Sequence, residues 1–283
     1  MKWGDIESDF VGEFIGTFLL VFFGCGSVTV SVLYSAFSGL FEVAAIWGIG
    51  VTLAIYATRH LSCAHLNPAV SIAMVLAKRM QISKLAAYLG GQFLGAFVAA
   101  AVLFLLFSSS IASFEASQFI HRGAPESIKT AMLFGEFYPN PGNGLSTVVS
   151  MVQAATAECL GTFLLVFLIF SLTEGCNVGR PDNSFAPVFI GLTVTIIICI
   201  IAPLTQAGLN PARDLSPRIF SYLAGWGKAS FPDNNFGLFV YGLAPIVGAS
   251  FAAIFFIKIV EPIYLTKNDS KMCCSEDGRE QDI

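Results

Sequence analysis

Long apolar runs, separated by short polar stretches, follow one another along most of this chain. Six of these runs are long enough to cross the bilayer as helices, because about 20 residues span a hydrocarbon core of about 30 Å. They lie at about residues 10–33, 40–59, 84–108, 149–172, 185–204 and 237–260. We therefore expect an all-α membrane protein with six transmembrane helices.

Two shorter apolar stretches, at about 67–78 and 210–222, each open with the tripeptide Asn-Pro-Ala. Asparagine is a preferred N-cap, and proline fits the first helical turn, where its missing N–H would have had no partner. The two motifs are Asn67, Pro68 and Ala69, and Asn210, Pro211 and Ala212. Both stretches are too short to span a bilayer, so we expect two re-entrant half-helices that begin at these motifs.

The two halves of the chain repeat each other. The segment GEFIGTFLL at 12–20 matches AECLGTFLL at 157–165, and the two Asn-Pro-Ala motifs occupy corresponding places. Each half contains three full spans, an odd number, so the second half must have the opposite orientation in the membrane. We predict inverted repeats at about 10–108 and 149–260, joined by an extracellular loop at 109–148. The N-termini of the half-helices then meet near the middle of the bilayer.

Composition agrees with a lipid environment. Hydrophobic residues make up 55% of the 283 residues, charged residues only 12%, and the mean hydropathy is +0.73. Soluble domains carry about twice that share of charge. No basic patch with interleaved aromatic residues is present, which argues against nucleic acid as a partner. No hydrolase, phosphate-loop or metalloprotease motif occurs either, so we do not expect an enzyme.

Lysine and arginine positions predict the orientation. Lys78, Arg79, Lys84 and Arg180 fall on the same side of the membrane as both termini. The positive-inside rule therefore favours cytoplasmic termini. We expect the charged tail at 261–283 to be disordered in the cytoplasm.

Paired half-helices predict a pore for neutral solutes. Their N-terminal dipole ends repel cations, and the asparagine side chains can donate hydrogen bonds to a passing oxygen. Arg213 adds a fixed positive charge and up to five donors. Transport of this kind needs no covalent step, so no cofactor or metal is expected. A secondary transporter is a competing class, because it can also use inverted repeats and broken helices.

Four polar residues near the motifs have more than one interpretation. Glu13 and Glu158 could relay protons, or could accept hydrogen bonds from half-helix backbone; we favour the second role. His65 has no second metal ligand at a suitable spacing, so we expect it to brace the loop and line the inner vestibule. Asp214 is expected to contact loops while Arg213 faces the pore, since adjacent helical residues do not face each other.

The segments AHLNPAV at 64–70 and GLNPARD at 208–214, with the two Glu-x-x-x-Thr segments, resemble the major intrinsic protein family. This family contains the aquaporins and glycerol facilitators. The resemblance covers about residues 10–260 and implies a single aquaporin-like channel domain at 1–260, built as a right-handed bundle. It also implies a homotetramer with one pore per subunit, in the plasma or inner membrane. The run LAGWG at 223–227 and the long third loop resemble the glycerol-conducting branch.

By the family pattern, four positions form a selectivity filter: Trp47, Ile198, Ala207 and Arg213. Glycerol facilitators also carry a large aromatic residue at the position of Trp47. Ile198 and Ala207 depart from them, because a glycine and a larger residue are common at these two positions. The set instead resembles the filter of plant nodulin-like intrinsic proteins.

The resemblance implies a passive channel for glycerol, other small neutral solutes and water that excludes ions and protons. The alternative is a nodulin-like or water-selective channel that carries urea, small acids or metalloid hydroxides.

Overall fold

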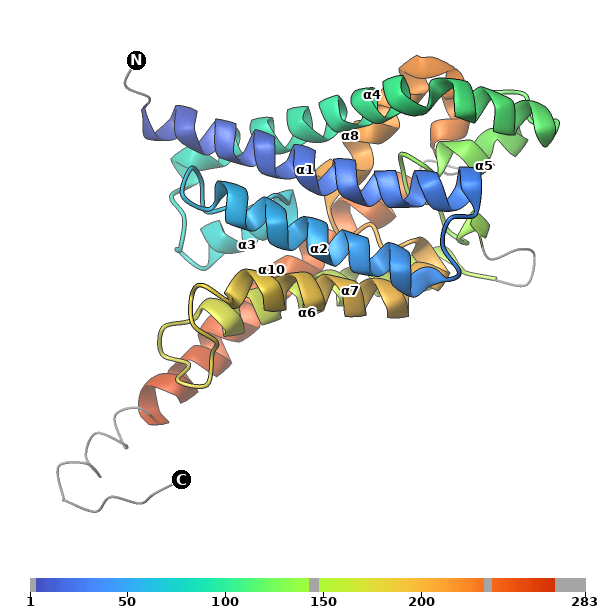
Figure 1. Ribbon diagram of the computed structural model, residues 1–283. Coiled ribbons are helices and arrows are strands. Elements are labelled where there is room, and N and C mark those ends of the chain that lie inside the picture. Colours follow the sequence, from blue (N-terminus) through green and yellow to red (C-terminus); the bar gives the residue numbers. More distant parts are fainter. Residues whose placement is uncertain (1–3, 143–147, 232–235, 268–283) are drawn as a thin grey trace, which may run out of the picture.

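The computed structural model in Figure 1 describes residues 4–142, 148–231 and 236–267. All regular structure within these residues is helical, and six helices are long and apolar enough to cross a membrane. This finding confirms the predicted fold class. The spans are α1 (Asp5–Tyr34), α2 (Leu40–Thr58), Ile82–Ser117 with α4 (Leu85–Ser117), α6 (Met151–Thr173), α7 (Ala186–Thr205), and Phe239–Lys267 with α10 (Ala244–Phe255).

Two half-helices lie among these spans. α3 (Pro68–Leu76) and α8 (Pro211–Ser221) begin directly after Asn67 and Asn210. Each asparagine side chain caps its helix by accepting a hydrogen bond from a backbone N–H of the first turn. In Figure 1, α3 lies near the end of the bundle where α1 begins, and α8 lies toward the opposite end. The half-helices therefore enter the bundle from opposite sides.

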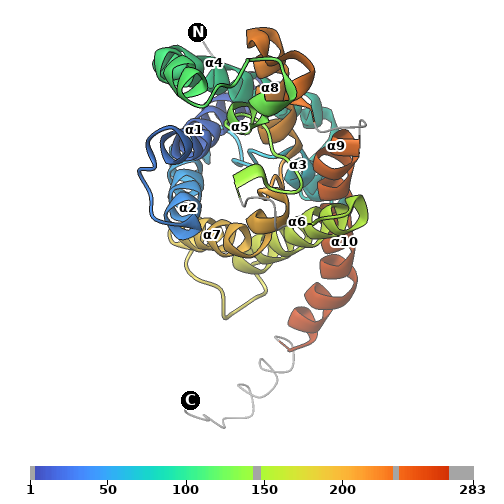
Figure 2. The same cartoon turned by 90° about the vertical axis from the view of Figure 1, so that its right-hand side faces the viewer.

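Short helical segments complete the chain. The loop after α4 contains Pro125–Ser127 and α5 (Ile128–Ala131), and α8 continues through Tyr222–Trp226 and Gly227–Ser230. α9 (Phe236–Leu238) directly precedes the last span, which includes the π-helical turns Phe239–Leu243 and Phe256–Val260. In Figure 2 the loop helix α5 and the half-helix α8 lie within the ring of long helices, at the end of the bundle that faces the viewer.

Glycines allow the long helices to touch through their backbones. A Cβ atom on Gly48 of α2 would overlap the carbonyl oxygen of Gly191 of α7, and a Cβ on Gly191 would overlap that of Gly48. Between α6 and α10, Gly248 faces the carbonyl of Cys159 in the same way. Such close approach is a common source of helix association in lipid, where the hydrophobic effect between helices is absent.

We expect Gly248→Ala to lower the free energy of unfolding by about 1–3 kcal/mol, since the added methyl would push against backbone that cannot move aside. The measurement is chemical unfolding of the purified protein in detergent. Gly242→Ala is the matched control, because nothing lies within 4 Å of a Cβ at that position. Equal stability of the two variants would contradict this packing role.

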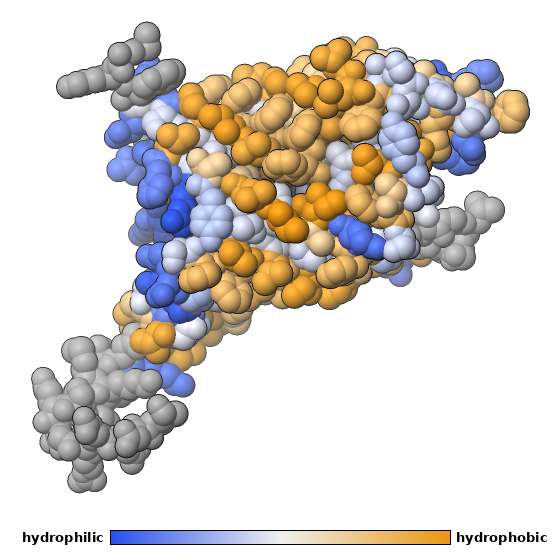
Figure 3. All heavy atoms as spheres, in the orientation of Figure 1, coloured by the Kyte–Doolittle hydropathy of each residue, from blue (hydrophilic) through white to orange (hydrophobic). Residues whose placement is uncertain are grey.

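Hydrophobic side chains cover the middle of the face seen in Figure 3, and hydrophilic side chains gather at the end near the N-terminus. Large apolar residues such as Leu105, Ile200 and Phe251 are more than half exposed. A continuous exposed apolar surface of this kind marks contact with lipid.

Two predicted boundaries are wrong. The third span was expected to end at residue 108, but α4 continues to Ser117. Serine can remain within a helix where its hydroxyl finds a partner, and Ser110 of α4 receives a hydrogen bond from the Tyr34 hydroxyl of α1. The last span continues to Lys267, so disorder from 261 is also wrong for its first residues. Tyr264 packs there against Phe256. Residues 268–283 lie outside the described part of the chain.

Candidate solute pore

One cavity of about 550 Å³ lies between the half-helices and the surrounding spans. Its polar lining includes Arg59, Arg79, Asn183, Arg213 and both Asn-Pro-Ala asparagines, and Trp47 also lines it. Apolar side chains such as Val51 and Val194 cover much of the remaining wall. The cavity is thus a largely apolar channel with a few polar groups.

The two asparagines hold the half-helix N-termini together. Asn67 Nδ2 donates to the carbonyl of Leu209 at 2.9 Å, and Asn210 Nδ2 donates to the carbonyl of Leu66 at 2.7 Å. Each amide nitrogen carries two hydrogens, so each asparagine keeps one donor for a molecule in the cavity.

The loops before the asparagines repeat one unusual backbone pattern. Ala64 and Leu66 have φ of 53° and 54°, and the equivalent Ala207 and Leu209 have φ of 62° and 53°. A left-handed conformation at a residue other than glycine costs on the order of 1–3 kcal/mol, and it persists only where surrounding contacts enforce it. Both loops therefore need strong contacts with the rest of the bundle.

Glu13 and Glu158 supply those contacts. Both carboxylates are fully buried. Glu13 accepts hydrogen bonds from the backbone N–H of His65 at 2.8 Å and of Leu66 at 2.7 Å, and from the side chains of Ser62 and Gln92. Glu158 accepts from the N–H of Gly208 at 2.9 Å and of Leu209 at 2.7 Å, and from the Thr205 hydroxyl at 2.6 Å. In each repeat a carboxylate on a long helix thus fixes the strained loop.

The four filter positions come together on the cavity wall. Trp47, Ile198, Ala207 and Arg213 all line it. The Cζ atom of Arg213 lies 4.4 Å from the centre of the Trp47 ring, which is the geometry of a cation–π contact. The sequence predicted this grouping; that the group selects solutes stays a prediction.

His65 and Asp214 both make local contacts. His65 lines the cavity, its Nδ1 lies 3.2 Å from the Ser71 hydroxyl, and its ring packs 4.7 Å from that of Tyr88. Asp214 accepts hydrogen bonds from the Arg218 side chain and points away from Arg213 toward the loop after α4. Within the described residues no group of three His, Cys, Asp or Glu side chains could hold a metal ion.

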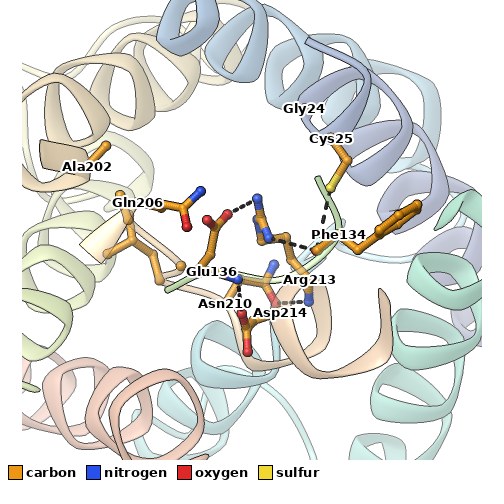
Figure 4. A network of polar contacts seen from close by, with 12 residues as sticks. Gly24, Cys25, Phe134, Glu136, Ala202, Gln206, Asn210, Arg213 and Asp214 are labelled. Carbon is orange, nitrogen blue, oxygen red and sulfur yellow. Dashed lines mark hydrogen bonds and ion pairs between the residues drawn. The ribbon is translucent and has the colours of Figure 1, made fainter. Parts of the chain in front are cut away.

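Sequence analysis missed Glu136, which forms an ion pair with Arg213 (Figure 4). Glu136 belongs to the loop between α4 and α6, and only 2% of its surface is exposed. The carbonyl of Phe134 in the same loop accepts from Arg213 Nη1 at 3.5 Å. The available signal was a lone acidic residue within the apolar run MLFGEF at 132–137.

Charged residues of α8 hold this loop in place. The backbone N–H of Glu136 donates to Asp214 Oδ1 at 2.8 Å, and Arg218 donates to the backbone carbonyl of Glu136. Gly135 leaves room for the Arg218 guanidinium, since a Cβ there would lie 2.8 Å from its Cζ. Phe137 N–H donates to Gln206 Oε1 at 2.8 Å. The loop segment is thus fastened on both sides of the Glu136 carboxylate.

Burial raises the pKa of Glu136 to about 8, and the positive charge of Arg213 opposes part of that rise. The group therefore changes charge within a pH range that transport assays can reach.

Comparison with known proteins places the chain among membrane channels. A family model described as "Major intrinsic protein" matches residues 2–256. The glycerol uptake facilitator protein of Pseudomonas aeruginosa is 41% identical over 245 residues, which is 86% of this chain and 85% of that protein. The glycerol uptake facilitator protein of Escherichia coli is 39% identical over 257 residues, 90% of this chain and 89% of that protein. The X-ray structure of the aquaglyceroporin from Plasmodium falciparum has a TM-score of 0.78 and 28% identity, covering 92% of this chain and 98% of that one.

Proposed function

The chain belongs to the major intrinsic protein family, and on that premise we propose that it is a passive transmembrane channel for glycerol, other small neutral solutes and water. The observation that carries the proposal is the cavity of about 550 Å³ at which both half-helix N-termini meet. The relatives named above, which are glycerol uptake facilitators, support glycerol as a solute.

A solute in this cavity exchanges water for fixed protein groups. Its oxygen atoms accept hydrogen bonds from Asn67, Asn210 and Arg213, while its carbon atoms lie against the apolar wall. An ion would lose its hydration shell without a matching partner, which costs far more than moving a neutral polyol. The positive half-helix ends also orient water oxygens toward the asparagines, which interrupts the chain of donors that a proton would need.

The test is stopped-flow light scattering on proteoliposomes that contain the purified protein, with glycerol, urea, erythritol and water gradients. We expect glycerol flux above that of empty liposomes, proportional to the gradient and independent of any ion gradient. Flux that saturates at low glycerol concentration and follows an ion gradient would instead show a secondary transporter.

Ile198 and Ala207 favour a second candidate, a channel whose filter passes urea, small acids or metalloid hydroxides. Both residues line the cavity with Trp47. Compared with the usual glycerol-facilitator filter, the side chain is larger at position 198 and smaller at position 207. Substantial urea flux in the same assay, at a rate comparable to that of glycerol, would support this broader selectivity.

We expect Ala207→Phe to reduce urea and erythritol flux relative to water flux by about tenfold. A difference of even one methylene group in an apolar pocket alters the discrimination between substrates by about 1–3 kcal/mol. Leu204→Phe is the matched control, since Leu204 is 37% exposed and does not belong to the cavity wall. If the flux ratios of Ala207→Phe equal those of the unmodified protein, residue 207 does not line the constriction.

We also propose that both termini are cytoplasmic and that four copies assemble, each with its own pore. α1 begins and the last span ends at the same end of the bundle as α3. The basic residues Lys84 and Arg79 lie there, because Lys84 pairs with Asp9 of α1 and Arg79 with Glu261 of the last span, which supports this orientation. The tetramer rests on membership of the family. Protease accessibility of tagged termini in sealed vesicles tests the first proposal, and the mass of the detergent-solubilised particle tests the second.

A further inference from the structure

The cavity wall presents hydrogen-bond donors from Asn67, Asn210 and Arg213, and the Glu136 carboxylate provides an acceptor beside Arg213. Arg213 can only donate hydrogen bonds, so a hydroxyl that accepts from it still needs an acceptor for its own hydrogen. One carboxylate oxygen of Glu136, Oε1, pairs with Arg213 Nη2. Among the described residues, none donates a hydrogen bond to the other oxygen, Oε2. Figure 4 shows the ends of the Glu136, Gln206 and Arg213 side chains directed toward the same open centre.

We propose that Glu136 is a further selectivity residue, whose carboxylate accepts the hydroxyl hydrogen of a solute that Arg213 binds through the oxygen. The proposal rests on the channel function proposed above and specifies its solute class: molecules with hydroxyl donors, such as polyols. A hydroxyl approaches a carboxylate oxygen more closely than an N–H donor does. Glu136 should therefore favour glycerol over urea.

The position of the carboxylate is fixed well enough for such selection. The backbone on either side of it is held by Asp214 and Arg218, and its partner Arg213 is itself held by Phe134 and Trp47. A binding group that is held in place loses little entropy when a solute arrives.

The protonation state of Glu136 should make the solute preference of the channel depend on pH. Its ionisable neighbours are Arg213, Asp214 and Arg218 from α8, Glu158 from α6, Cys25 from α1 and Tyr241 from the last span. Below a pH of about 8 the Glu136 carboxyl takes up a proton, because burial has raised its pKa. A neutral carboxyl is a weaker acceptor than a carboxylate, by roughly half the bond strength. Preference for hydroxyl solutes should therefore rise with pH.

The experiment compares glycerol and urea flux into proteoliposomes at pH 6 and at pH 9, with the same pH on both sides. In the unmodified protein we expect the ratio of glycerol to urea flux to rise by about tenfold from pH 6 to pH 9. Glu136→Gln should show the low ratio at both pH values. Glu136→Asp, which keeps the charge, should retain a pH-dependent ratio. Glu115→Gln is the matched control, because Glu115 is also buried and paired with an arginine, Arg122, away from the cavity.

A ratio that does not change with pH in the unmodified protein would overturn the proposal. So would a Glu136→Gln channel that keeps the native ratio at pH 9, or one in which urea flux falls as much as glycerol flux. The last result would show that Glu136 only holds the pore in shape. Absence of glycerol flux in the unmodified protein at either pH would instead refute the channel function itself.

Discussion

At pH 9, where Glu136 is ionised, replacing Arg213 with valine is expected to lower the free energy of unfolding by about 3–5 kcal/mol, because it leaves a buried carboxylate without its cationic partner. Glu136 is 2% exposed and pairs with Arg213, which is 4% exposed. The same change removes the fixed charge and the donors from the predicted filter. We therefore also expect Arg213→Val to discriminate less among neutral solutes and to admit small ions.

The two effects can be separated by a double-mutant cycle. Glu136→Gln removes the charge that Arg213→Val leaves unpaired, so the double variant should be more stable than the sum of the single effects predicts. Chemical unfolding in detergent at pH 9 measures stability, and flux of glycerol, urea and sodium measures solute selectivity. Arg122→Val is the control, since Arg122 pairs with Glu115 outside the cavity wall. If the effects of the two substitutions on stability simply add, the Glu136–Arg213 pairing is contradicted. If solute selectivity does not change, Arg213 is not part of the filter.

Local chemistry explains why the spans and half-helices could be predicted from sequence. Asn67 and Asn210 cap α3 and α8 through atoms only two or three residues away, so each Asn-Pro-Ala motif contains the information for its own helix start. The inverted repeat followed from the number of spans in each half. The errors at residues 108 and 260 arose where helices leave the bilayer, because hydropathy does not indicate how far a helix continues into water.

The position of Glu136 beside Arg213 could not be predicted from the local sequence. Its partners Asp214, Arg213 and Arg218 lie 77–82 residues farther along the chain, and nothing local brings them together. The polar loop at 109–148 suggested an exposed connection, whereas the segment 134–137 folds back against α8. A lone acidic residue in an apolar run indicates burial, and a buried acid requires a partner. Only the packing of the loop shows that this partner is the predicted filter arginine.

Glu158→Leu is expected to lower the free energy of unfolding by about 2–6 kcal/mol, because two buried N–H groups lose their acceptor at about 1–3 kcal/mol each. These are the N–H groups of Gly208 and Leu209, and Leu209 has a left-handed backbone conformation. Without the carboxylate the loop before Asn210 should relax, and glycerol flux should fall close to that of empty liposomes. Glu126→Leu is the control, since Glu126 is an exposed acid in the loop after α4.

Glu158→Gln distinguishes the structural role from a proton relay. Glutamine keeps an acceptor oxygen at nearly the same place, so part of the glycerol flux should survive, and neither variant should change the rate at which a pH gradient decays. A relay would require that the unmodified protein dissipate the gradient and that Glu158→Gln stop it. The Glu158 oxygens accept three hydrogen bonds, from Thr205, Gly208 and Leu209, and all three hold the loop before Asn210, which supports the structural role.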